Sequence, residues 1–115
     1  MIHHLALAAD WAAAQAAGEY RISTLGAGLD EVGFVHAAHA DQVAGVAERF
    51  YADVTDDLVL LVIDPDRLDV PVVEEVPDGA AEAFPHVYGP VPVGAVVDVL
   101  PVERSAEGRF VIPRL

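Results

Sequence analysis

The sequence predicts an α+β domain with two helices and a sheet that is antiparallel or mixed. Both stretches with helical spacing lie in the N-terminal half, whereas extended stretches dominate the remainder. This order does not fit a regular alternation of strands and helices. A length of 115 residues is enough for one hydrophobic core and too short for two. We therefore expect residues 1–115 to form a single domain.

The first helix is predicted to follow directly after the first strand. Residues 2–7 (IHHLAL) are typical of a strand, and Asp10 is expected to cap the N-terminus of a helix over residues 11–17. Gly18 then stands just after the helix, where glycine adopts a left-handed conformation most easily. Residues 19–23 are expected to form a short strand.

The second helix is predicted from the spacing of its apolar residues. It comes after a glycine-rich loop at residues 25–33 and a histidine-bearing extended segment at residues 33–38. Within residues 40–51 the apolar side chains recur at helical intervals, which indicates an amphipathic helix. These side chains are Val43, Val46, Ala47 and Phe50.

Strands are expected to dominate the rest of the chain. Residues 58–63 (LVLLVI) are continuously apolar, which is typical of a central strand buried on both faces. A turn or a single helical turn is expected next, because Pro65 suits an early position in either. Further strands are predicted at residues 70–76, 84–90, 94–103 and 108–113, with a loop at residues 77–83.

Composition narrows the range of possible partners. The formal net charge of −13 argues against nucleic acids and anionic membranes, because both require a basic surface. The chain has no cysteine and no lysine, which excludes disulfides, thiol nucleophiles and Schiff bases. No apolar run approaches the ~18 residues of a membrane span, and the N-terminus lacks the basic start of a signal peptide. We expect a cytoplasmic protein with a small-molecule ligand.

Aromatic and histidine residues are predicted to share one face of two strands. Side chains alternate along a strand, so Phe84, His86 and Tyr88 point to one side. Phe34 and His36 share a face in the same way. Such a face suits a concave pocket that stacks a flat ring and hydrogen-bonds hydroxyl groups. The alternative is that these histidines are hydrogen-bonded residues of an ordinary core.

Other kinds of site are weakly indicated. His36 and His39 could both bind zinc if residues 36–39 were helical, because they would then lie on one side of the helix. His86 or Glu74 would supply a further zinc ligand. The extended backbone expected there would point His36 and His39 to opposite faces, so no metal site is predicted. Glu74 and Glu75 would also point oppositely on a strand, and Glu74 is the candidate to face the pocket.

Several segments together resemble a known family. They are IHHL, GFVHAAHADQV, GVAERFY, DLVLLVIDP, VVEE and FPHVYGPVP, in this order. From residue 2 to about residue 102 they are similar to a small bacterial family, domain-of-unknown-function family 952. The family is similar in fold to the ADP-ribosyltransferase-like group, which has a split, strongly curved sheet with an NAD-binding cleft. His3 and Ala38 depart from the tyrosine and the polar residue usual in the family.

The resemblance implies roles for individual residues. His4 would contact a ribose hydroxyl, and Phe34, Tyr88 and Arg49 would complete a nucleotide-binding site. Arg49 and Arg21 are the two candidates to bind a pyrophosphate. The catalytic group would then consist of His36, His86 and Glu74, with NAD as a substrate and no further cofactor.

Three functions are consistent with this sequence. The first is a transferase or glycohydrolase acting on NAD, ADP-ribose or a similar nucleotide. The second is a non-catalytic small-molecule binding module, and the third is a structural or interaction protein. The oligomeric state is not predicted.

Overall fold

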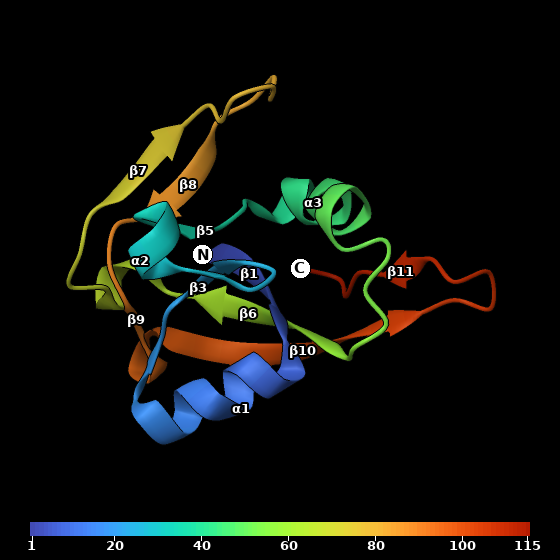
Figure 1. The fold of residues 1–115 in the computed structure, drawn as a ribbon, viewed down its shortest axis with the longest axis horizontal. Coiled ribbons are helices and arrows are strands. Elements are labelled where there is room, and N and C mark those ends of the chain that lie inside the picture. The colour runs from blue at the N-terminus through green and yellow to red at the C-terminus, as the bar shows by residue number, and fades with distance from the viewer.

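The computed structural model describes residues 1–115, and its largest sheet has four antiparallel strands (Figure 1). The order of these strands is β1 (Ile2–Leu7), β6 (Leu58–Ile63), β10 (Val96–Arg104) and β11 (Phe110–Val111). β6 lies between β1 and β10, and Leu60, Leu61 and Ile63 are fully buried. The prediction of a central strand at residues 58–63 is therefore confirmed.

A second sheet carries His36 and His86 and lies beside the first. Its three antiparallel strands are β5 (Val35–His36), β8 (Phe84–Val87) and β7 (Val72–Glu75), with β8 in the middle. Two short ribbons pair β2 (Glu19–Tyr20) with β9 (Val91–Pro92), and β3 (Ile22–Thr24) with β4 (Ala27–Gly28). The β-structure is thus divided into several pieces that curl around one another, and every strand pairing is antiparallel.

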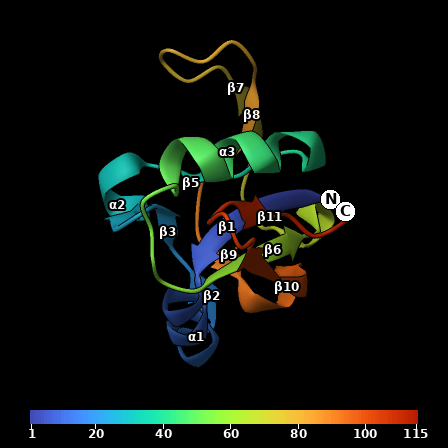
Figure 2. The same ribbon diagram turned by 90° about the vertical axis from the view of Figure 1, so that its right-hand side faces the viewer.

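The two longer helices cover opposite faces of the large sheet. They are α1 (Ala8–Ala17) and α3 (Val43–Phe50), and the views agree that the sheet lies between them (Figures 1 and 2). Trp11 of α1 packs in one buried cluster, and Val46 of α3 packs in another. A short helix, α2 (Leu29–Val32), and 3₁₀ turns at Ala40–Gln42, Pro65–Arg67 and Val93–Ala95 complete the fold.

Alternation along β1 separates its two histidines. His4 is paired with Leu61 and His3 with Val62, so the two rings point to opposite faces of the sheet. Backbone hydrogen bonds between His3 and Ala38, of 2.8 and 2.7 Å, then tie β1 to the segment that follows β5. The first strand is therefore the connection between the large sheet and the smaller one.

Several predicted boundaries are corrected by the structure. α1 begins at Ala8 with Leu7 as its N-cap, so Asp10 lies inside the first turn, where its charge complements the helix dipole. Gly18 ends the helix as predicted, with φ of 90°. The predicted strand at residues 19–23 is interrupted at Arg21, and the loop at 25–33 contains β4 and α2.

The second helix is confirmed, with one difference in its packing. Val43, Val46 and Ala47 are buried as expected, but Phe50 is 45% exposed. Phe50 lies on the last turn of α3 and contributes to a cavity instead of the core. None of the helices is long and apolar enough to cross a membrane.

Gly89 allows the chain after β8 to pass close to Val70, which precedes β7. A Cβ atom at this position would lie 2.4 Å from Cγ1 of Val70, well inside van der Waals contact. We expect Gly89→Ala to lower the free energy of unfolding by about 1–3 kcal/mol, the usual cost of overpacking, in urea denaturation. Gly94→Ala is the control, because nothing lies within 4 Å of that position. Adding Val70→Ala to Gly89→Ala should restore part of the loss; equal stability of Gly89→Ala and Gly94→Ala would contradict the steric explanation.

Candidate functional site

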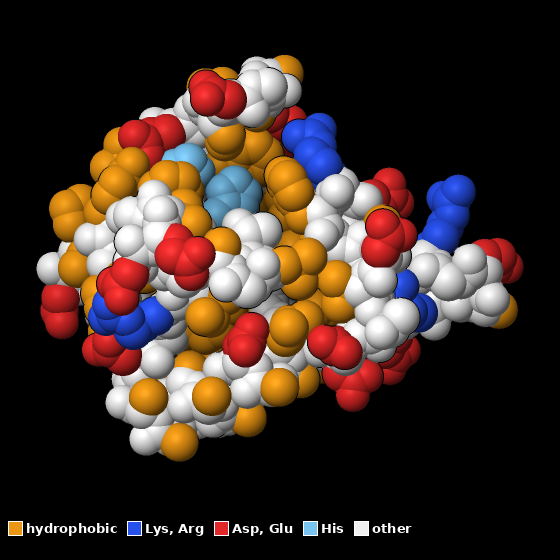
Figure 3. Space-filling view, viewed as in Figure 1, with side chains coloured by type: hydrophobic (Ala, Val, Ile, Leu, Met, Phe, Trp, Pro, Cys, Tyr) orange, Lys and Arg blue, Asp and Glu red, His pale blue; other side chains and the backbone are white.

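A cavity of about 350 Å³ lies against one face of the small sheet. Phe34, Phe50 and Phe84 contribute to its apolar walls, and His36 and His86 line it beside them. In the space-filling view, histidine side chains are visible in a hollow surrounded by hydrophobic side chains (Figure 3). Further lining comes from Ser23 and Thr24 of β3, from Arg49 of α3 and from the loop at residues 77–80.

Strand register explains why these rings converge. His36 of β5 is paired directly with His86 of β8, and His86 is paired on its other side with Val73 of β7. Directly opposed residues of antiparallel strands have their side chains on the same face. Phe84 is paired with Glu75 in the same way. Glu75, and not the predicted Glu74, therefore shares the histidine face.

A carboxylate and two imidazoles form a continuous hydrogen-bonded relay at this face. Oε1 of Glu75 lies 2.8 Å from Nδ1 of His86, and Nε2 of His86 lies 3.2 Å from Nδ1 of His36. The hydroxyl of Tyr88 also donates to Oε1 of Glu75. We refer to Glu75, His86 and His36 below as the relay.

The hydrogen-bond partners determine where the protons of the relay lie. The hydrogen bonds from Tyr88 and His86 lower the pKa of Glu75, so its carboxylate accepts and Nδ1 of His86 donates. When His86 is neutral, its Nε2 can only accept, so Nδ1 of His36 donates to it. Burial, with a smaller contribution from the charge of His86, lowers the pKa of His36 to about 4. His36 is thus a neutral imidazole, and its Nε2 has no protein partner.

Aromatic rings hold the imidazoles in place. The ring of Phe34 stacks on His86 with centroids 3.9 Å apart and an angle of 13° between the planes. Phe84 lies 5.1 Å from the ring of His36, and Phe50 approaches His36 edge-on at 6.3 Å. Such contacts favour a fixed ring orientation. Tyr88 packs obliquely against Phe34 and lies outside the cavity wall.

His4 lies behind the cavity and not in it. Its Nδ1 is 2.6 Å from the carbonyl oxygen of His36, so this nitrogen donates, and its Nε2 is 3.0 Å from the hydroxyl of Tyr20 and therefore accepts. Burial lowers the pKa of His4 to about 4, which keeps it neutral. Because both ring nitrogens are occupied, the structure gives His4 a role in supporting β5 instead of the predicted contact with a ligand.

Glu74 and His39 form a separate pair outside the cavity. Oε1 of Glu74 lies 2.7 Å from Nε2 of His39, and both side chains are half exposed. Glu74 is opposite Pro85, on the face of the small sheet away from His86. The chain has no group of three or more histidine, aspartate or glutamate residues arranged to hold a metal ion.

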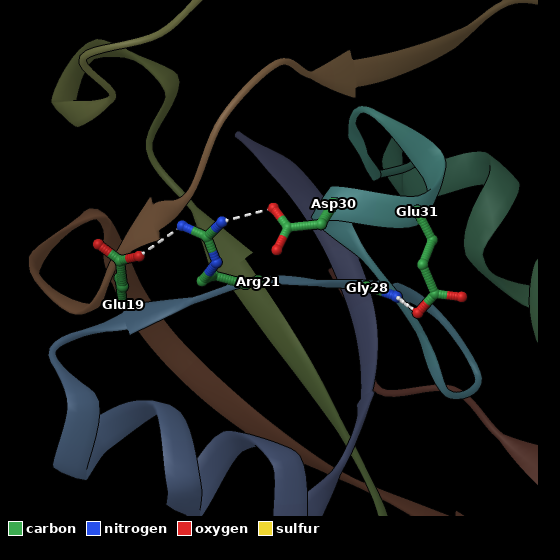
Figure 4. Close-up of polar contacts among 5 residues, drawn as sticks. All are labelled: Glu19, Arg21, Gly28, Asp30 and Glu31. Carbon is green, nitrogen blue, oxygen red and sulfur yellow. Dashed lines mark hydrogen bonds and ion pairs between the residues drawn. The ribbon is translucent and has the colours of Figure 1, made fainter.

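Arg49 is the arginine that lines the cavity, where it is exposed on the last turn of α3. Arg21 is instead held on the surface by Glu19 and Asp30, at 2.9 Å each (Figure 4). The same view shows Glu31 accepting a hydrogen bond from the backbone nitrogen of Gly28, which stabilises the start of α2. Only Arg49 is therefore placed to meet a negative group at this cavity.

The fold and the cavity define a small α+β protein with a curled antiparallel sheet and a histidine-lined pocket. The chain belongs to the family described as "Protein of unknown function (DUF952)", whose model matches residues 5–99. The predicted family is thereby confirmed. No curated protein matches the chain.

Solved structures of one bacterial protein are similar to this chain. The crystal structure of CC0527 from Caulobacter crescentus is 26% identical with a TM-score of 0.79, covering 95% of this chain and 91% of that one. A crystal structure of its double mutant is 25% identical, with the same TM-score and coverage. The solution NMR structure of CC0527 is 26% identical with a TM-score of 0.75, covering 94% and 89%. These similarities support the α+β fold, and the relationship to ADP-ribosyltransferases stays a prediction.

Glu75 and Phe50 were not predicted as members of the site, whereas Phe84 was predicted to share the pocket face with His86. Phe84 follows from the same alternation that identified His86, since it is two residues away on the strand. Glu75 could not be chosen over Glu74 without the pairing register of β7 and β8. Phe50 was assigned to the core because its helical spacing matched that of Val46.

Glu75 should control the titration of Tyr88. The pKa of the Tyr88 phenol is raised, mainly by its hydrogen bond to Glu75. Burial raises the pKa of both other tyrosines, that of Tyr51 to about 12, so Tyr88 should ionise first. We expect Glu75→Gln to move the first phase of an ultraviolet tyrosine titration to lower pH. Glu74→Gln is the matched control and should leave it unchanged; the same shift in both variants would contradict the contact.

His4 should make stability depend on pH. A histidine with a pKa of about 4 when folded and about 6.5 when unfolded stabilises the native state above pH 6.5. This contribution, about 3 kcal/mol for 2.5 pKa units, is lost as the pH falls towards 4, because only the unfolded chain then takes up the proton.

We expect the urea-derived stability difference between the wild type and His4→Gln to shrink by about that amount over this pH range. A difference that stays constant with pH would show that His4 titrates normally in the native protein.

Proposed function

We propose that the protein binds a small organic molecule with a flat ring in the cavity beside the relay, that His36 contacts its polar groups, and that His86 orients His36 through their hydrogen bond. The observation that carries this proposal is an aromatic-walled cavity lined by two imidazoles that are hydrogen-bonded to each other and backed by a carboxylate. A volume of about 350 Å³ falls within the roughly 300–1,000 Å³ of small-molecule sites.

The walls and the polar groups suit different parts of such a ligand. Phe34, Phe50 and Phe84 offer surface for stacking or edge contacts with a planar ring. Ser23, Thr24 and the imidazoles supply polar groups at the same cavity. Because His86 is only 3% exposed and both of its ring nitrogens are hydrogen-bonded, it would contact the ligand through a C–H edge of the ring. This combination of apolar walls and few polar groups is typical of selective ligand pockets.

The relay also suits proton transfer. His36 could take up a proton at Nε2 while its Nδ1 proton moves to Nε2 of His86. The positive charge would then lie on His86 beside Glu75, and not on the more weakly stabilised His36. In this form of the proposal His36 and His86 are catalytic as predicted, and Glu75 supplies the carboxylate role expected of Glu74.

A nucleotide of the NAD or ADP-ribose type is the specific ligand class that the family resemblance favours. Arg49 supports this class, since its guanidinium could pair with a phosphate at the cavity. The formal charge of −13 opposes it, because an anionic ligand is repelled at long range. Nicotinamide riboside contains the same flat ring without a phosphate, so comparison of the two ligands separates recognition of the ring from recognition of the phosphate.

An NMR titration tests the proposal. With NAD or nicotinamide riboside we expect saturable shifts of the Phe34, His36 and His86 ring signals, and weaker binding in His36→Gln by about tenfold, equivalent to about 1.4 kcal/mol. His39→Gln is the control, because His39 lies outside the cavity.

The outcomes of this titration separate the candidate functions. Nicotinamide release that depends on His36 would establish an enzyme, whereas binding without turnover would establish a binding module. No shift with either compound, even at millimolar concentration, would overturn the nicotinamide-nucleotide class.

A further inference from the structure

A second, much smaller cavity lies between β1, α3 and the segment that follows β5. It shares His36 and Thr24 with the larger cavity, so the two adjoin each other. His3, Val46 and Tyr51 contribute to its remaining wall. The space that the centre of a water molecule could occupy is about 10 Å³, which corresponds to roughly one water.

Two buried ring nitrogens, each belonging to a residue that lines this cavity, have no partner in the protein. They are Nδ1 of His3 and Nε2 of His36, and they are the only buried side-chain nitrogen or oxygen atoms in the chain without a hydrogen bond. His3 is 95% buried, being 5% exposed. Leaving a buried polar atom unsatisfied costs about 1–3 kcal/mol, so native proteins nearly always pair such atoms with protein or water.

We infer that this cavity is a binding site for a single internal water molecule, which bridges Nδ1 of His3 and Nε2 of His36. Water fits because it both donates and accepts, so it satisfies either tautomer of His3. The hydroxyls of Thr24 and Tyr51 belong to the same wall and bring the number of possible partners to four. Buried waters make about three hydrogen bonds on average.

A metal ion fits this cavity less well than water. Zinc is held by three or four protein ligands, and only two nitrogens of the cavity are free. The hydroxyl of Tyr51 already donates to the carbonyl oxygen of Leu5, at 3.3 Å, and remains a neutral group. An apolar guest would leave both nitrogens unpaired, which is the cost that water removes.

The water would extend the relay into the interior of the protein. Glu75, His86 and His36 are already joined by hydrogen bonds, and the water adds His3 as the fourth side chain. The chain of contacts then runs from the exposed edge of the small sheet to the first strand. Nε2 of His36 is also the atom that takes up a proton in the proposed relay, so in that proposal the proton would reach it through this water. The water itself is tested in the ligand-free protein and does not depend on which ligand the larger cavity binds.

The test is NMR detection of the water in the ligand-free protein. We expect nuclear Overhauser effects between a long-lived water molecule and both the ring protons of His36 and the methyl group of Thr24. His3→Phe removes both ring nitrogens, including Nδ1, and enlarges the ring, and should abolish these contacts. His39→Phe makes the same change at a half-exposed histidine and should preserve them.

A milder variant guards against misfolding of His3→Phe. Thr24→Val keeps the side-chain shape and removes one hydroxyl partner, so the water should exchange faster while the contacts to His36 remain. Absence of any long-lived water at His36 in the wild type would overturn the inference. Persistence of the same contacts in a folded His3→Phe protein would also overturn it, and so would stoichiometric zinc binding at the two nitrogens.

Discussion

The hydrogen bond from His4 to the carbonyl oxygen of His36 joins the hydrophobic core to the candidate site. It is short, at 2.6 Å, and its donor ring is fixed from the other side by Tyr20. The backbone of β5 is also held by Ser23, whose hydroxyl accepts a hydrogen bond from the backbone nitrogen of His36 at 3.1 Å. A strand of two residues has few ladder hydrogen bonds of its own, so these side-chain contacts position His36 for its pairing with His86.

Burial outweighs charge in setting the protonation state of His4 and His36. A protein with a formal net charge of −13 should favour protonated imidazoles, yet His4 and His36 both have a pKa lowered to about 4. Most of the carboxylates are solvent-exposed and screened, and an exposed pair of charges is worth no more than about 1 kcal/mol. Loss of hydration by a buried imidazolium is larger and local, so the neutral form prevails. The acidic surface and the neutral interior are therefore largely independent of each other.

The sequence was most informative where a single segment determines its own structure. The continuous apolar run of β6, the alternation that aligns His86 with Phe84, and the helical spacing of Val43 and Val46 were all confirmed. It was least informative where two distant segments must be brought into register. The choice of Glu75 over Glu74 depends on how β7 aligns with β8. The pairing of His36 with His86 across 50 residues is of the same kind.

The position of β7 at the margin of the small sheet has a further consequence, for aggregation. One edge of this strand has no neighbouring strand, so its backbone N–H and C=O groups can pair with a strand of another molecule. β7 ends in two consecutive glutamates, one on each face, so a strand adding there would have to approach carboxylates from either side. Self-addition in a register that places the glutamates opposite each other would bring like charges together, which is destabilising. The carboxylate that orients His86 thus also helps to keep an open sheet margin from polymerising.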